Sequence, residues 1–334
     1  MRSSRPTLAA VAREAGVSSA TASMALNDRP GVRRETRLAV LAAARRLGYR
    51  RAGAASPGGG LIGVLPTDLG NPYHTDVIAG IEEHAEREGL GVVIAHGRRD
   101  SAHLERQLQR LLALGVDGVI AVTTWLSPAA LEAAAATLPV VVIGRMQDAV
   151  PGTDTVRNDD EAGAALAVRH LVERGHRHLV HVTLSTRPGP ASRRAGFLAE
   201  AERLGLREQV HVIGPDSPRD GMEMVLRALR RGDQDAPTAV FAANDIAAVS
   251  VLHRAADHRV QVPQQLSVVG YDSSTVALTV RPHLTSVNQP RSEMGRLAAQ
   301  MLQERWRGRE HDSLSVVAPV LRVRGSTGIG PALR

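Results

Sequence analysis

The chain has 334 residues, of which 43% are hydrophobic and 22% charged, a normal globular composition. It contains no cysteine, which excludes disulfides, thiol catalysis and cysteine-ligated metals and is compatible with a reducing compartment. The N-terminus lacks the apolar run of a secretory signal, and no stretch of about 18 apolar residues is free of charge. We therefore expect a cytoplasmic protein that does not enter a membrane.

The excess positive charge is concentrated at the N-terminus. The whole chain has a formal net charge of +7, whereas residues 1–51 carry eleven arginines and three acids, a net of +8, which leaves −1 for residues 52–334. A folded basic segment is typical of a polyanion binder, because each phosphate that it neutralises releases counterions. A basic disordered tail is the alternative, but it would lack the helical periodicity of this segment.

Three short helices are predicted in the basic segment. The first is capped by Thr7, has apolar residues at helical spacing, and ends at Gly16. The second spans about 18–26, with a serine as its N-cap, and the third spans about 34–47. Helix, glycine turn, short helix, loop and longer helix is the plan of a helix-turn-helix, which we place at residues 1–50.

The second of these helices is the predicted DNA-reading element. Its small apolar residues should face the three-helix core, so that its N-terminal outward residues can reach base edges in the major groove. Thr21 and Ser23 carry hydroxyls suited to phosphate contacts, which position a protein on DNA. An ordinary solvated helix is the alternative. The candidate DNA contacts are Thr7, Ser18, Ser19, Ala20, Thr21, Ser23, Met24, Asn27, Arg33 and Tyr49.

A different pattern follows residues 51–60, a Gly-rich stretch predicted to be a linker. Short β-branched runs alternate there with helical stretches, which is typical of parallel sheets covered on both faces. The runs are 61–65, 92–95, 118–122, 140–143, 179–183, 210–213, 239–241 and 267–271. Eight or more strands favour two doubly wound lobes, at about 61–158 and 159–285 with later crossovers, within a domain spanning 61–334. Ligands of such sheets bind beyond the carboxyl ends of the strands, which predicts a cleft between the lobes.

Several motifs occur in a fixed order along almost the whole chain. They are TLAAVAREAGVSSATASMALNDRPGVRRETR at 7–37, LGYR at 47–50, NPYH at 71–74, AAND at 242–245, SVVGYD at 267–272, LTSVNQP at 284–290 and VRGST at 323–327. In this order and spacing they resemble the lactose-repressor (LacI/GalR) family. The resemblance implies a homodimeric repressor that binds double-stranded operator DNA. It also implies a lobed domain like periplasmic sugar-binding proteins, with an effector between the lobes that controls operator affinity.

The chain departs from the family pattern at three places. Met24 stands where relatives often carry an arginine suited to guanine, so a different operator preference is expected. Residues 51–60 contain no leucine to wedge into the minor groove, as the hinge of relatives does. Gly144 stands where relatives often have an acid, which removes one acceptor for a sugar hydroxyl.

Candidate effector contacts come from strand ends and from positions that match ligand contacts of the family. An arginine fork and an aspartate suit hydroxyls or an anionic group, and Trp125 is predicted either to stack on a sugar ring or to pack in its loop. The candidates are Asn71, Tyr73, His74, Trp125, Arg145, Arg193, Asn244, Asp245, Asp272 and Gln289. A sugar or sugar-like effector is expected, with a nucleoside or purine as the alternative.

Signatures of catalysis and of cofactor binding are absent from the sequence. It has no dinucleotide or phosphate loop, no HExxH and no GxSxG, so we expect neither an enzyme nor a cofactor. His176, His178 and His181 form the densest histidine cluster, but on a strand the third points away from the first two, which disfavours a metal site. A solute-binding protein or a sugar-metabolising enzyme would share the lobed fold, but the first would not carry residues 1–51.

Overall fold

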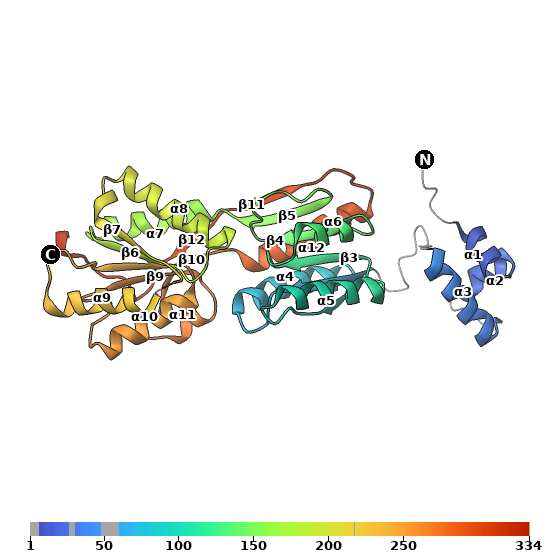
Figure 1. The fold of residues 1–334 in the computed structure, drawn as a ribbon, viewed down its shortest axis with the longest axis horizontal. Coiled ribbons are helices and arrows are strands. Elements are labelled where there is room, and N and C mark those ends of the chain that lie inside the picture. Colours follow the sequence, from blue (N-terminus) through green and yellow to red (C-terminus); the bar gives the residue numbers. More distant parts are fainter. Residues whose placement is uncertain (1–6, 27–30, 48–59, 217, 334) are drawn as a thin grey trace. The chain divides into compact units, whose positions relative to one another are not determined.

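The computed structural model describes residues 7–26, 31–47, 60–216 and 218–333 (Figure 1). The chain divides into two compact units, Met1–Gly58 and Gly59–Arg334. Asn27, Tyr49 and the predicted linker up to residue 59 lie outside the described residues.

The described part of the N-terminal unit forms α1 (Leu8–Glu14), α2 (Ser19–Leu26) and α3 (Arg34–Leu47). The predicted caps are confirmed, because the Thr7 hydroxyl accepts the Ala10 amide at 3.3 Å and the Ser18 hydroxyl accepts the Thr21 amide at 3.0 Å. Small apolar side chains from all three helices form the core, which lets short helices pack closely. They are Val11, Ala12, Ala22, Ala25, Val40, Ala43 and Ala44.

The first lobe of the larger unit contains a six-stranded sheet with the strand order β11-β5-β4-β3-β1-β2, parallel throughout. Its strands are β1 (Leu61–Pro66), β2 (Gly91–Ile94), β3 (Gly118–Val122), β4 (Val140–Ile143), β5 (Thr153–Asn158) and β11 (Leu314–Val317). Its helices are α4 (Pro72–Arg87), α5 (Ser101–Leu114), α6 (Pro128–Ala135) and α12 (Arg291–Trp306). Successive strand residues point to opposite faces, so Ile120 packs with α4 and α12 while Ala121 packs with α5 and α6.

The second lobe contains a six-stranded sheet with the order β12-β10-β9-β8-β6-β7, in which only β12 is antiparallel to its neighbour. Its strands are β6 (Leu179–Val182), β7 (Val210–Ile213), β8 (Ala239–Ala242), β9 (Ser267–Asp272), β10 (Thr285–Asn288) and β12 (Val320–Arg322). Helices α7 (Asp160–Glu173) and α8 (Pro188–Arg203) cover one face. Helices α9 (Pro218–Arg231) and α10 (Asp245–Asp257) cover the other, beside the short α11 (Val276–Thr279). Two 3-10 turns, Arg207–Gln209 and Pro331–Leu333, complete the described elements.

The chain passes between the lobes three times: after β5, between β10 and α12, and between β11 and β12 (Figure 1). The second passage brings α12 and β11 to the first lobe, and the third returns the chain to the second lobe at β12. All eight predicted strands are present. The polar β5 (TDTVRN) and the short β10 (TSVN) were not predicted as strands, because they lack a β-branched apolar run.

Helices α4 and α12 approach each other closely because glycines lie at their contact. A Cβ atom on Gly295 would collide with the carbonyl of Val77, and one on Gly80 with the carbonyl of Ser292. Glycine is therefore required for this backbone-to-backbone contact. The contact holds the N-termini of both helices at the edge of the first lobe that faces the second.

Candidate functional sites

Helix α2 turns its predicted outward residues away from the N-terminal core. Ala22 and Ala25 are buried, whereas Ser19 and Ala20 at the helix start are exposed. Thr7 and Arg33 are also exposed, at the starts of α1 and α3. The residues Thr21, Ser23 and Met24 are half-buried. The helix thus offers a small, exposed N-terminal surface with few bulky side chains, which is the shape that a major-groove contact needs.

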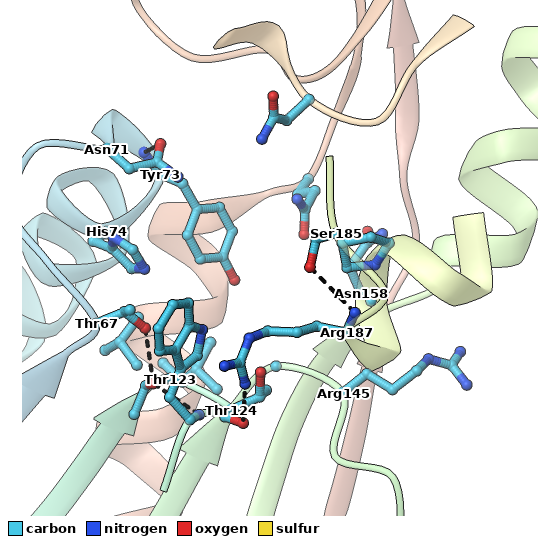
Figure 2. A pocket seen from close by; sticks show the side chains of 18 of the residues that line it. Thr67, Asn71, Tyr73, His74, Thr123, Thr124, Arg145, Asn158, Ser185 and Arg187 are labelled. Atoms are coloured by element: carbon cyan, nitrogen blue, oxygen red, sulfur yellow. Dashed lines mark hydrogen bonds between the residues drawn. The ribbon is translucent and has the colours of Figure 1, made fainter. Parts of the chain in front are cut away.

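A cavity of about 240 Å³ lies between the two lobes at the carboxyl ends of their strands (Figure 2). Residues directly after β1, β3 and β4 contribute from the first lobe, and residues after β6 and β8 from the second. Eight of the ten predicted effector residues line it: Asn71, Tyr73, His74, Trp125, Arg145, Arg193, Asn244 and Gln289. Asp245 and Asp272 do not line it.

Several polar residues of the cavity wall are not among the residues predicted from the sequence. They include Thr67, Asp68, Arg99, Thr123, Asn158, Asp160, Ser185 and Arg187. Most of them follow a strand end, so the rule that predicted Trp125 could have found them if applied to every strand. Asn158 was not identified because β5, the strand that carries it, was not predicted.

Tyr73 and His74 reach the cavity from the first turn of α4. The Asn71 side chain caps this helix by accepting the Tyr73 amide at 3.1 Å, and the two rings meet edge to face at 5.4 Å. Burial lowers the pKa of His74 to about 4, so its imidazole is neutral at pH 7. Its buried Nδ1 has no hydrogen-bond partner among the described residues. The residue lines the cavity, but this nitrogen is itself covered by protein atoms.

Asp160 forms ion pairs with two arginines of the cavity wall. Arg193 Nε donates to Asp160 Oδ1 at 2.9 Å, and Arg145 Nε lies 3.8 Å from Asp160 Oδ2. Burial alone would lower the pKa of Arg193, but the adjacent Asp160 carboxylate raises it above its usual range. The Arg193 guanidinium also lies 3.9 Å above the ring of Tyr271, which fixes its position.

Arg187 extends from the start of α8 in the second lobe to the first lobe (Figure 2). Its guanidinium lies 3.7 Å from the ring centroid of Trp125, and its Nη1 donates to the Thr124 carbonyl at 3.5 Å. A cation over an indole face is attracted by the quadrupole of the ring. Arg187 and Trp125 therefore join the two lobes at the cavity.

Asp245 and Asp272 lie behind the cavity wall. The Asp245 carboxylate accepts hydrogen bonds from the amide and hydroxyl of Ser274 and from the hydroxyl of Ser286. Asp272 Oδ1 accepts from Gln289 Nε2 at 2.5 Å. Gln289 does line the cavity, so Asp272 acts on the cavity by orienting that amide. Burial raises the pKa of both carboxyls.

The three clustered histidines have separate partners. His176 Nδ1 is 2.9 Å from the Thr238 hydroxyl, His181 Nδ1 is 3.0 Å from the Phe241 carbonyl oxygen, and His178 lies 4.0 Å from Asp235. In the described part of the chain, no three His, Cys, Asp or Glu side chains are placed to hold a metal ion. In the same residues, no helix combines the length and apolar character needed to cross a membrane.

Comparison with known proteins decides the family. Residues 7–52 match the model of bacterial regulatory proteins of the lacI family, and residues 168–327 match a periplasmic binding protein-like domain. The HTH-type transcriptional repressor PurR of Erwinia tasmaniensis is 31% identical over 336 residues, which cover 97% of this chain and 98% of the relative. The chain belongs to the lacI family. It is accordingly a DNA-binding transcriptional regulator and not an enzyme.

Solved structures of other lacI-family regulators have the same fold over almost the whole chain. The lac repressor dimer bound to operator and the anti-inducer ONPF has a TM-score of 0.70 and 26% identity, with 97% of this chain and 99% of that chain covered. The complex of the transcriptional regulator CelR with cellobiose has a TM-score of 0.66 and 29% identity, with 96% and 100% covered. The predicted fold, a helix-turn-helix followed by a two-lobed domain, is confirmed.

Proposed function

We propose that this regulator is a homodimeric repressor whose operator affinity is controlled by a small sugar-like molecule bound in the interlobe cavity. The observation that carries the proposal is the cavity itself, because both lobes contribute polar side chains to it. A ligand that contacts both lobes binds one lobe arrangement better than another. It therefore shifts the population of lobe arrangements, and in a dimer such a shift changes how the paired DNA-binding units meet an operator.

The size and lining of the cavity favour a compact polyol. Its volume, about 240 Å³, lies below the roughly 300–1,000 Å³ typical of pockets for drug-sized ligands. Hydroxyl and amide groups of Thr67, Asn158 and Ser185 are available for hydroxyl groups, and the ring of Tyr73 points into the cavity (Figure 2). CelR binds the disaccharide cellobiose; the volume here favours a monosaccharide.

A nucleoside or purine is the second candidate. Two aromatic side chains, Tyr73 and Trp125, line the cavity and could stack on a planar base. A thermal-shift screen of sugars and nucleosides, described below, decides between these two classes of ligand.

The proposed DNA contacts are the outward residues of α2, supported by Thr7, Ser18 and Arg33 at the helix starts. Met24 cannot donate a hydrogen bond to a base, so we expect this regulator to select its operator without an arginine–guanine contact from that position. The lac repressor is a dimer on its operator, and we propose the same assembly for this chain.

Ala20→Asp tests the DNA-reading surface. Ala20 is exposed in the first turn of α2, where the helix dipole favours an acid, so the fold should retain its stability. The new carboxylate would meet DNA phosphates, and we expect operator affinity to fall at least about tenfold, or 1.4 kcal/mol. Band shifts on the upstream DNA of the regulator's own gene, over a salt series, measure the loss.

Ala20→Asn is the matched control, because it has the same shape without the charge, and it should bind the operator much more tightly than Ala20→Asp. Equal binding by the two variants and the wild type would show that this surface does not face DNA. Binding by the wild type that is neither sequence-selective nor salt-sensitive would contradict the regulator mechanism as a whole.

A thermal-shift screen of monosaccharides and nucleosides tests the effector class. A ligand present at about 100 times its dissociation constant should stabilise the larger unit by about 2.7 kcal/mol. The same ligand should change operator affinity in the band shift. The proposal fails if stabilising ligands leave operator binding unchanged, or if nucleosides stabilise and sugars do not.

A further inference from the structure

The lining of the interlobe cavity has more positive than negative charge. Its arginines are Arg99, Arg145, Arg187 and Arg193, and its carboxylates are Asp68 and Asp160. His74 does not add to the positive charge at pH 7, because burial lowers its pKa to about 4. Glu161, 3.8 Å from Arg145, and Asp272, 4.0 Å from Arg193, lie outside the lining and offset part of this charge, but neither forms an ion pair with Arg187.

The two carboxylates of the lining are already engaged. Asp160 is shared by Arg145 and Arg193, as described above. Asp68 Oδ1 accepts the amides of Gly70 at 2.7 Å and Asn71 at 3.0 Å, so it holds the turn before α4. Neither carboxylate neutralises Arg187.

Arg187 has only neutral partners in the described part of the chain. They are the Trp125 ring and the Thr124 carbonyl, and no described carboxylate lies within 4.0 Å of it. Arg187 is half-buried at the cavity, and burial lowers its pKa below the usual arginine value. Partial burial without an anion is costly for a guanidinium, and its planar fork is suited to a carboxylate or phosphate.

We infer that the effector carries a compact anionic group, a carboxylate or a phosphate, which is bound by Arg187 at the junction of the two lobes. This inference rests on the proposed function, since it specifies the charge of the ligand in the same cavity. The remainder of the ligand lies against Tyr73 and His74, which line the cavity from the start of α4. A sugar acid or a sugar phosphate has both parts.

The anionic group also links ligand binding to lobe arrangement. Arg187 belongs to the second lobe, while its present partners Trp125 and Thr124 belong to the first. An anion held by Arg187 changes the charge at this contact between the lobes. The anion is therefore the part of the ligand that distinguishes one lobe arrangement from another.

Trp125 provides a direct readout, because the chain has two tryptophans and the other is Trp306. In full-length protein carrying Trp306→Phe, Trp125 is the sole tryptophan and lies against Arg187. The probes are inorganic phosphate, D-glucose 6-phosphate, D-glucuronate and D-glucose, titrated at constant ionic strength. Thermal shifts of the protein without Trp306→Phe give a second measurement that does not depend on this substitution.

We expect saturable fluorescence changes with phosphate and with at least one sugar anion, and weaker binding of glucose. Comparison of glucose 6-phosphate with glucuronate distinguishes a phosphate from a carboxylate ligand. Arg187→Gln should weaken anion binding by about 10- to 100-fold and weaken glucose binding by much less. Arg207→Gln, on an exposed 3-10 turn, is the matched control and should bind as the wild type does.

Three results would overturn the inference: no saturable response to any of the anions, glucose binding at least as tight as that of both sugar anions, or anion binding that survives Arg187→Gln. Band shifts separate these failures from failure of the proposed function. If a neutral sugar alters operator binding, the proposed function stands and the inference about charge is wrong. If ligands of neither kind alter operator binding, both fail.

Discussion

Asp154→Ala is expected to destabilise the larger unit by about 3 kcal/mol, because it removes the buried carboxylate shared by two partly buried guanidinium groups and leaves them only the more exposed Asp312 and Glu304. Asp154 is completely buried on β5 and accepts hydrogen bonds from Arg305, Arg309 and the Ser313 amide. Burial would raise the pKa of this carboxyl, but the hydrogen bonds from Arg309 and Arg305 hold the pKa below its usual value. Its charged form is thus part of the native structure.

Urea unfolding followed by circular dichroism measures the effect of Asp154→Ala. Asp235→Ala is the matched control, since the Asp235 side chain is 95% exposed, and its free energy of unfolding should stay within about 0.5 kcal/mol of the wild type. A loss below about 1 kcal/mol for Asp154→Ala would show that Arg305 and Arg309 find other partners. The hydrogen bonds of Asp154 join β5 to the end of α12. We therefore expect Asp154→Ala also to weaken effector binding.

Acidification from pH 7 to pH 5 is expected to destabilise the larger unit through three buried histidines, by roughly 2 kcal/mol each. Burial lowers the pKa of His74, His170 and His181 to about 4. The unfolded chain, in which a histidine has a pKa of about 6.5, therefore binds protons in this range that the native state does not bind. The stability contributed by neutral histidine is present above pH 6.5 and is lost as the pH falls towards 4.

His181→Phe isolates one of these contributions. His181 is completely buried and packs against the rings of Phe197 and Phe241, so phenylalanine fits the site but loses the bond to the Phe241 carbonyl. The substitution should destabilise the protein at pH 7, and the loss should be about 2 kcal/mol smaller at pH 5. The raised pKa values of Asp245 and Asp272 act in the opposite direction, but they are common to both proteins and cancel in this difference.

Thermal or urea unfolding at pH 7, 6 and 5 measures the difference between His181→Phe and the wild type. His253→Gln, on the exposed side of α10, is the control and should leave the pH dependence unchanged. A constant difference between His181→Phe and the wild type across this range would mean that His181 has the same pKa in the native state as in the unfolded chain.

The interlobe cavity combines groups of two kinds. Tyr73, His74 and Asn71 belong to the start of one helix, so their proximity follows from local sequence and the cap at Asn71. Arg187 and Trp125 are separated by about sixty residues and come from different lobes. The position of the first kind is set locally, whereas that of the second depends on how the two lobes are arranged.

The amino-acid sequence by itself determined the local elements of this protein and part of the cavity. Helical spacing placed all three helices of the N-terminal unit, and hydroxyl caps marked the starts of two of them. Apolar runs placed eight strands, and the rule that ligands bind beyond strand ends placed Trp125 at the cavity. These features depend on residues within one or two turns or along one strand, so a sequence pattern contains them.

Only the tertiary structure decided which distant residues meet. The return of α12 to the first lobe brings Arg305 to Asp154, 151 positions earlier, and no local pattern marks that pair. Asp245 and Asp272 also lie at strand ends, as the cavity residues do. Their carboxylates, however, accept hydrogen bonds from serine and glutamine side chains and lie behind the cavity wall. The contact of Arg187 with Trp125, and with it the expected charge of the effector, depends on two lobes facing each other. The spacing of apolar residues along the chain is a local property, whereas the contacts between distant residues are set by where the chain crosses from one lobe to the other.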